Sequence, residues 1–219
     1  MLQDRSGKFS IAQLRELLQQ RFPRSQPVAL AGLPTGIPKI DDSLGGGLPR
    51  GAVSEVVEAR AGSGGQLVLI ALLEAVRRLH RFVVLVDAMD GFDPQTVEPS
   101  LLRHLLWVRG NGVTPALQAA DLLARDNNMS ALILDLRDSP VRDLHRVPAT
   151  VWFRFQRVVE TTEMVLVVLT PHSLVSSARV RLQLERSLPL VAFDQPRRNL
   201  QASLAPALQR QRYPVEATG

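Results

Sequence analysis

The feature that most constrains the fold is a repeated alternation of uninterrupted apolar runs with segments of helical periodicity. The apolar runs predict strands at Val53–Val57, Phe82–Asp87, Ala131–Leu136 and Val165–Thr170. The segments between them predict helices at Leu67–Leu79, Pro99–Trp107, Pro115–Arg125 and Val151–Glu160. Strands made of continuous valine, isoleucine and leucine are typical of a parallel sheet that is buried on both faces. The sequence therefore predicts an α/β fold with a mostly parallel sheet flanked by helices.

Both ends of the chain differ from this alternating region. Residues 11–22 place apolar side chains along one side of a short helix, with Ser10 as N-cap and Pro23 as its stop. We expect an N-terminal helix and linker over residues 1–32, a core domain over 33–194 and a basic flexible tail over 195–219. Near the end of the core, SARVRLQLER alternates like a strand, and LPLVAFD is expected to pair beside it as a hairpin.

The composition excludes several kinds of site. The 219 residues include no cysteine, which rules out disulfides, thiolate zinc sites and cysteine nucleophiles. We expect no metal site, because no metal-ligand spacing relates the four histidines, His80, His104, His145 and His172. The first residues lack the apolar segment of a signal peptide, and the apolar runs are too short to span a bilayer. We therefore expect a cytoplasmic protein without membrane contact.

The net charge of +5 comes almost entirely from arginine, since Lys8 and Lys39 are the only lysines. An excess of positive charge is typical of proteins that bind nucleic acid or acidic partners. It is equally typical of a solvated surface, so the charge alone does not separate these interpretations.

A glycine-rich turn, Gly62-Ser63-Gly64-Gly65-Gln66, joins the first core strand to the first core helix, which is the setting of a phosphate-binding loop. Such a loop needs a lysine for the β- and γ-phosphates and a hydroxyl for Mg²⁺. Neither lysine lies near this turn, Arg60 is a poor substitute, and Glu58 would repel a triphosphate. We expect a structural turn with no cofactor; residual binding of ATP and Mg²⁺, or of another anion at the helix N-terminus, is the alternative.

Several stretches resemble the RecA recombinase family in the same order along the chain, from about Ile11 to Arg186. They are LPTGIPKIDDSLGGGLPRGAVSEV, VVLVDAMDGFDP, ALQAADLLARDNNMSALILDLRDS and VRLQLER. The resemblance implies a RecA-like core and places Asp135 at the position of the Mg²⁺-linked carboxylate. It also shows departures, because Met89 stands where the family has its catalytic glutamate, and Asp90 beside it is expected to point elsewhere.

The loops that bind DNA in a recombinase are also reduced. The second would have to fit between Pro171 and Arg179, and residues 139–148 are a shortened version of the first. A protein that lacks the lysine, the hydroxyl, the glutamate and a DNA loop is not expected to be an enzyme that hydrolyses ATP.

A RecA-like core of this length with a basic tail resembles the ImuA family of bacterial SOS-response proteins. That resemblance implies an accessory protein of error-prone translesion DNA synthesis. Its partners would be ImuB, an inactive relative of Y-family polymerases, and, through it, an error-prone replicative-type polymerase, with RecA as a further partner. A single-stranded DNA-binding module, or a weak ATP-binding switch, is the alternative function.

A direct DNA contact would fall on the candidate arginines Arg142, Arg146, Arg154 and Arg157, which are interleaved with aromatic residues. Arginines that contact the backbone beside rings that stack on bases form a typical single-strand binding surface. The alternative is a helix that buries Trp152, Phe155 and Val159 while its arginines stay solvated.

Candidate partner surfaces lie at both ends of the chain. Leu14 and Leu18 belong to the apolar stripe of the first helix, which packs on its own domain or on a neighbouring subunit. Val28 and Leu30 follow it and are candidates for self-association, or for docking onto RecA, by strand addition. Leu200, Leu204 and Leu208 recur every fourth residue in the tail, as in a segment that folds on a partner, although a frayed helix has the same pattern.

Overall fold

The computed structural model describes residues 32–126 and 128–211. The predictions for the first helix and the linker, including Leu14, Leu18, Val28 and Leu30, lie outside these residues. In the described part of the chain, no helix is long and apolar enough to cross a membrane.

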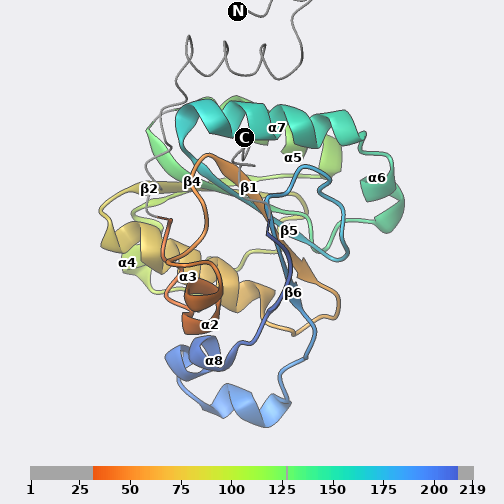
Figure 1. The fold of residues 1–219 in the computed structure, drawn as a ribbon. Helices are drawn as coiled ribbons and strands as arrows, with labels where there is room; N and C mark the ends of the chain where they lie inside the picture. Colours follow the sequence, from red (N-terminus) through yellow and green to blue (C-terminus); the bar gives the residue numbers. More distant parts are fainter. Residues whose placement is uncertain (1–31, 127, 212–219) are drawn as a thin grey trace, which may run out of the picture. The chain divides into compact units, whose positions relative to one another are not determined.

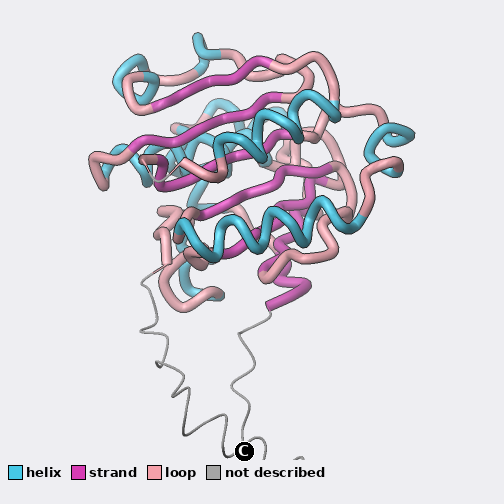
Figure 2. The backbone as a smooth tube through the Cα atoms, turned by 90° about the horizontal axis from the view of Figure 1, so that it is seen from above, coloured by secondary structure: helices cyan, strands magenta, loops and turns pink. Residues whose placement is uncertain are grey.

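A seven-stranded sheet in the order β3-β2-β4-β5-β1-β6-β7 forms the centre of this part of the chain (Figures 1 and 2). Its first six strands are mutually parallel, and β7 pairs with β6 in the antiparallel sense. The strands are β1 (Ala52–Glu58), β2 (Phe82–Asp87), β3 (Leu105–Arg109), β4 (Met129–Asp135), β5 (Val165–Thr170), β6 (Val180–Leu184) and β7 (Ala207–Gln211). The predicted α/β class is confirmed.

Helices cover the two faces of the sheet and divide the apolar interior into two cores. The helices are α2 (Pro38–Ser43), α3 (Gly65–Arg78), α4 (Pro99–Leu102), α5 (Val113–Leu123), α6 (Val141–His145), α7 (Ala149–Thr162) and α8 (Arg197–Ser203). Buried residues of α3, α4 and α8 share one core with alternate strand residues, and those of α5, α6 and α7 share the other. Burying a leucine or valine stabilises the fold by about 1.5–3 kcal/mol, so strands buried on both faces contribute strongly.

Helix α3 shows how the sequence sets the bounds of an element. Its first residue follows Gly64, whose φ of 106° lies in the left-handed region that glycine adopts without strain. The helix ends with His80 N–H donating to the Arg77 carbonyl at 2.8 Å and Arg81 N–H donating to the Val76 carbonyl at 3.1 Å. This pair of bonds is a Schellman motif, which satisfies carbonyls at a helix C-terminus.

The prediction of one helix over Pro99–Trp107 is wrong. The chain forms only the single turn of α4 there and then enters β3, which pairs with β2 in the register Val83↔Leu105 to Asp87↔Arg109. Pairing along the open edge of β2 satisfies the backbone and outweighs the local helical pattern.

The C-terminal predictions also need correction. The segment LPLVAFD does not form a hairpin strand but a 3-10 helix, η2 (Leu190–Asp194), and a second one, η1 (Pro94–Thr96), lies elsewhere. The strand beside β6 is β7, with Val180 opposite Gln211. Residues 197–211 thus belong to the fold, so the flexible tail predicted from residue 195 is wrong for this stretch. Pro189 and Pro196 directly precede η2 and α8, where proline suits the start of a helix but not a central strand.

Candidate functional site

The glycine-rich loop lies at the carboxyl end of β1, where ligands bind in open α/β sheets. Gly62 and Gly64 have φ angles of 77° and 106°. Ser63 is buried, and its hydroxyl donates to the Arg60 carbonyl at 2.7 Å within the same turn. The one hydroxyl of the loop is therefore engaged by the loop itself.

The Arg137 guanidinium lies directly against this loop. It donates through Nε to Asp135 Oδ1 at 2.9 Å, and its Nη1 lies 3.1 Å from Glu58 Oε2. Its Nη2 lies 2.5 Å from Asp135 Oδ2 and 3.2 Å from Gln66 Oε1. The Arg137 side chain is only 14% exposed. We call Arg137, Glu58, Asp135 and Gln66 the Arg137 cluster.

The Arg137 cluster occupies the space beside the loop backbone. A Cβ atom added to Gly65 would lie 2.6 Å from Arg137 Nη1 and would also collide with the Glu58 carboxylate. Glycine at position 65 therefore allows a close approach of the protein's own side chains. Because the cluster holds two carboxylates and one guanidinium, it carries an excess negative charge that repels phosphate.

The charge on Arg137 is secured by its partners. Burial by itself lowers the pKa of this guanidinium, but the hydrogen bond and charge of Asp135, together with Glu58, raise the pKa above its usual value. Arg137 thus remains a cation, and a bound nucleotide would have to displace a hydrogen-bonded ion pair that is already formed.

The C-terminal segment closes the other side of the loop. Leu188 N–H donates to the Gly62 carbonyl at 2.9 Å, and the Ser187 hydroxyl donates to the Ala61 carbonyl at 3.3 Å. Leu204, which is 4% exposed, places Cδ2 within 2.5 Å of the position that a Cβ on Gly64 would take. Helix α8 lies next to α3, as Figure 1 shows.

This packing corrects the interpretation of the leucine stripe. Leu200 and Leu204 are 5% and 4% exposed and belong to the core that contains α3. They are not available as a partner surface, because the domain itself buries them. Leu208 on β7 is 37% exposed.

In the turn after β2, where the resemblance places a catalytic glutamate, the carboxylates are bonded to nearby groups. Met89 is 40% exposed. Asp87 accepts bonds from its own turn, from Gly91 N–H at 3.1 Å and Phe92 N–H at 2.8 Å. As expected, Asp90 points elsewhere and accepts from Arg109 Nε at 2.7 Å, a hydrogen bond that lowers the pKa of the Asp90 carboxyl.

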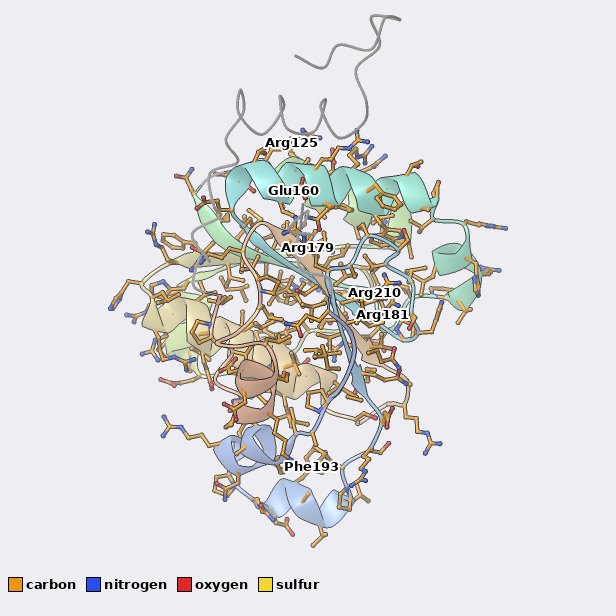
Figure 3. All side chains as sticks on the ribbon, viewed as in Figure 1. Arg125, Glu160, Arg179, Arg181, Phe193 and Arg210 are labelled. Carbon is orange, nitrogen blue, oxygen red and sulfur yellow. The ribbon has the colours of Figure 1, made fainter. Side chains whose placement is uncertain are left out.

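The short segment between Pro171 and Arg179 is held by a buried carboxylate that sequence reasoning missed. Glu55 of β1 is fully buried and accepts bonds from Leu174 N–H at 2.6 Å and Val175 N–H at 3.0 Å. Arg181 of β6, labelled in Figure 3, pairs with Glu55 at 2.5 Å and donates to the Val175 carbonyl at 3.0 Å. The signal in the sequence was an acid in the middle of an apolar strand, which must find a partner when it is buried.

The four candidate DNA-binding arginines are exposed, and three of them pair with nearby acids. Arg142 and Arg146 flank Asp143 at 3.6 Å each on α6, while Arg154 of α7 pairs with Asp121 at 2.9 Å, and Arg157 is exposed. Trp152, Phe155 and Val159 are almost completely buried. The predicted buried stripe of α7 is therefore confirmed, whereas Phe153 on the same helix is 50% exposed. DNA contact by the four arginines stays a prediction.

Among the described residues, no group of three or more histidine, aspartate or glutamate side chains could hold a metal ion. The glycine turn, the carboxylates at the ends of β2 and β4, and the shortened loop do share one edge of the sheet. In this arrangement, Ser63, Asp87 and the Arg137 cluster bond to one another or to their own turns.

Comparison with known proteins agrees with this architecture. No protein-family model matches the chain. It is 26% identical over 132 residues to the protein RecA of Picosynechococcus sp., covering 59% of this chain and 35% of that protein. It is 32% identical over 104 residues to the DNA repair protein recA homolog 1, chloroplastic, of Arabidopsis thaliana, covering 46% of this chain and 23% of that protein.

These similarities and the observed sheet define the class: an α/β protein with a RecA-like core. The chain spans about a third or less of the length of the curated relatives that it matches. The relationship therefore covers about half of this chain and does not by itself assign the activities of the longer proteins to it.

Proposed function

We propose that this chain is a non-catalytic RecA-like accessory protein of the bacterial SOS DNA-damage response, working in the cytoplasm. In this role the RecA-like core is a docking platform and not an ATPase. The observation that carries the proposal is the Arg137 cluster, which fills the glycine loop with an internal ion pair.

The energy of the Arg137 cluster opposes the binding of a nucleotide at the glycine loop. A phosphate that displaced Arg137 would leave the Glu58 and Asp135 carboxylates buried without their cation. Breaking a buried ion pair by removing one partner typically costs about 3–5 kcal/mol, which the binding of a nucleotide would have to supply. No lysine is present near the loop to recover that cost through the β- and γ-phosphates.

The link to DNA repair rests on the relatives, one of which is named as a DNA repair protein. The finer assignment, to error-prone translesion synthesis, rests on the resemblance to the ImuA family. The partners proposed on that ground are an ImuB-type inactive polymerase relative and RecA, with an error-prone replicative-type polymerase reached indirectly.

The first test is a melting curve of the full chain with and without excess ATP·Mg²⁺, with phosphate release followed in the same sample. We expect no shift of the Tm and no phosphate. A ligand at 100 times its Kd would add about 2.7 kcal/mol, a shift of several degrees for a protein of this size. Such a shift without turnover would make the protein a nucleotide switch. Turnover that is lost on changing Gly64 or Asp135 would contradict the proposal outright.

The adaptor role needs its own experiment. The immobilised full chain should capture an ImuB-type polymerase relative or RecA, and the captured amount should be the same with ATP·Mg²⁺ as without any nucleotide. Failure to capture either protein would refute the adaptor role, whatever the nucleotide experiment shows.

A further inference from the structure

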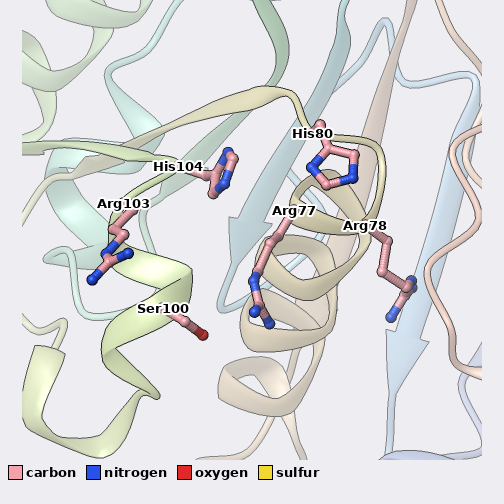
Figure 4. Close-up of a pocket in the computed structure, with 6 residues that line it drawn as sticks. All are labelled: Arg77, Arg78, His80, Ser100, Arg103 and His104. Atoms are coloured by element: carbon pink, nitrogen blue, oxygen red, sulfur yellow. The ribbon is translucent and has the colours of Figure 1, made fainter.

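A basic pocket lies at the edge of the sheet opposite the glycine loop. It has a volume of about 340 Å³ and lies between the C-terminus of α3 and the short helix α4 (Figure 4). The residues that line it are Arg77, Arg78, His80, Ser100, Arg103 and His104. No acidic residue is among them. We call this the Arg77–Arg103 pocket.

The positive charge of the pocket has no ion-pair partner among the described residues. No ion pair joins Arg77, Arg78 or Arg103 to a carboxylate there, whereas Arg137 and Arg181 are each paired with buried carboxylates. The acidic residue closest in sequence to the α4 side of the pocket is Glu98, which accepts a hydrogen bond from the Ser100 hydroxyl at 2.6 Å. Unpaired guanidinium groups gathered on one surface are the typical footprint of a phosphate-binding site.

Not every residue of the lining is equally free. Figure 4 shows Arg77 and Arg103 extending in the same direction on the α3 and α4 sides of the pocket, whereas Arg78 points to the other side of α3. A Cβ added to Gly36 would lie 2.9 Å from Arg78 Nη2, so Arg78 packs on that turn. The C-terminus of α3 favours cations at positions 77 and 78, whereas Arg103 comes from a second element, as the residue that follows the C-terminus of α4. Arg77 and Arg103 are thus the informative pair.

Two aromatic rings, those of Phe82 and His104, lie at the arginines of the pocket. The side chain of Phe82 is 50% exposed, although it is an aromatic residue at the start of a core strand. Its ring lies 5.6 Å from the ring of His104, centroid to centroid. One nitrogen of His104, Nδ1, contacts the Arg81 carbonyl at 3.0 Å, which fixes the orientation of the imidazole. Aromatic rings beside arginines provide base stacking next to backbone neutralisation.

The backbone at the pocket holds a residue that the fold alone does not favour. His80 has a φ of 52° and takes the position of the Schellman motif where glycine is usual.

We propose that the Arg77–Arg103 pocket binds the phosphate backbone of a single DNA strand, with Phe82 and His104 stacking on an adjacent base. This surface lies on the opposite edge of the sheet from the glycine loop and does not include the candidate arginines of α6 and α7. The inference is independent of the proposed accessory function, because it requires neither nucleotide nor a protein partner.

The test is fluorescence anisotropy with the full chain and a labelled oligo(dT) strand, at several salt concentrations. The variant R77A/R103A should bind about tenfold more weakly than the wild type or worse, and its salt dependence should be shallower by about one phosphate contact for each arginine that is lost. The matched control is R186A/R198A, which removes the same charge from two exposed positions outside every candidate DNA-binding set and should change the affinity less than threefold.

Further measurements test whether the pocket prefers a DNA strand to free phosphate and whether the Phe82 ring contributes to binding. F82A should weaken binding to the single strand and leave binding to a duplex of the same length unchanged. Inorganic phosphate at equal ionic strength should compete no better than chloride. H80G should weaken binding to the strand while it raises the Tm, because glycine relieves the backbone strain.

Several outcomes would overturn the inference. Equal losses in R77A/R103A and R186A/R198A would show that affinity depends only on net charge. Unchanged affinity in R77A/R103A would show that the pocket does not bind DNA. If the protein bound a duplex as tightly as a single strand, and F82A altered neither affinity, base stacking on Phe82 would be refuted. Melting curves of each variant guard against unfolding, since all the substituted side chains are at least partly exposed.

Discussion

At the scale of single residues, the chemistry of the loop is decided by one arginine that is distant in sequence. Arg137 lies 79 positions from Glu58 and 71 from Gln66, yet it bonds to both. A guanidinium can bond several partners in one plane, which suits it to hold two carboxylates and an amide together. The same position filled by a shorter or neutral side chain would leave the two carboxylates unpaired.

The first prediction concerns this residue. Arg137→Met should lower the free energy of unfolding by about 3–5 kcal/mol, because it leaves buried carboxylates without a cation. That loss corresponds to a fall in Tm of roughly 10 °C, measured by thermal melting. Arg142→Met, which removes an arginine that is 80% exposed, is the matched control and should stay within about 0.5 kcal/mol of the wild type. Equal Tm values for the two variants would show that the Arg137 cluster contributes nothing to stability.

At the scale of elements, the shortened loop after β5 is held by the strands beneath it. Glu55 of β1 lies in register with Arg181 of β6, so the pair forms within the sheet and then bonds the loop from below. This arrangement explains how a segment with little secondary structure keeps one conformation.

Glu55→Gln should loosen this loop. Hydrogen bonds to a charged group contribute about 1.5–3 kcal/mol each, so weakening them should speed amide exchange at Leu174 and Val175 by about tenfold or more. Hydrogen exchange measured by NMR or mass spectrometry over residues 171–179 would detect the change. Glu185→Gln, at an exposed position after β6, should leave exchange in this loop unaltered. Equal protection in both variants would argue against Glu55 as the anchor.

The segment after β6 supports a second prediction at this scale. Leu204→Ala should lower the free energy of unfolding by about 2–5 kcal/mol, as expected for a leucine truncated in a core. Leu208→Ala, the same substitution in the same sequence pattern but at a position that is 37% exposed, should cost much less. Denaturant unfolding of both variants would check this. A Leu204→Ala variant as stable as the wild type would restore the hypothesis that the stripe docks on a partner.

At the scale of the whole described domain, the two edges of the sheet have different characters. The carboxyl edge holds the glycine loop, the Arg137 cluster and Glu55, and Arg137 and Arg181 are paired there with carboxylates. The opposite edge holds the Arg77–Arg103 pocket, in which arginines from two elements gather without carboxylates. Variants at the two edges share no partners, so their effects on stability should be additive within about 0.5 kcal/mol in the R137M/R103A combination, as a melting experiment would measure. A larger deviation would mean that the edges are coupled.

The sequence by itself determined the α/β class, most of the strands and helices, and the absence of a lysine from the loop, because these depend on local periodicity and residue type. The sequence wrongly predicted a helix where residues 105–109 form β3, and a tail where residues 197–211 form α8 and β7. These segments are fixed by pairing with the edge of the sheet and by burial against α3, which are contacts with residues distant in the sequence. Only the tertiary structure brought Arg137 into the glycine loop, buried Leu200 and Leu204, and gathered Arg77 with Arg103. These are contacts between distant segments, whose energy arises from burial and charge pairing after the chain has folded.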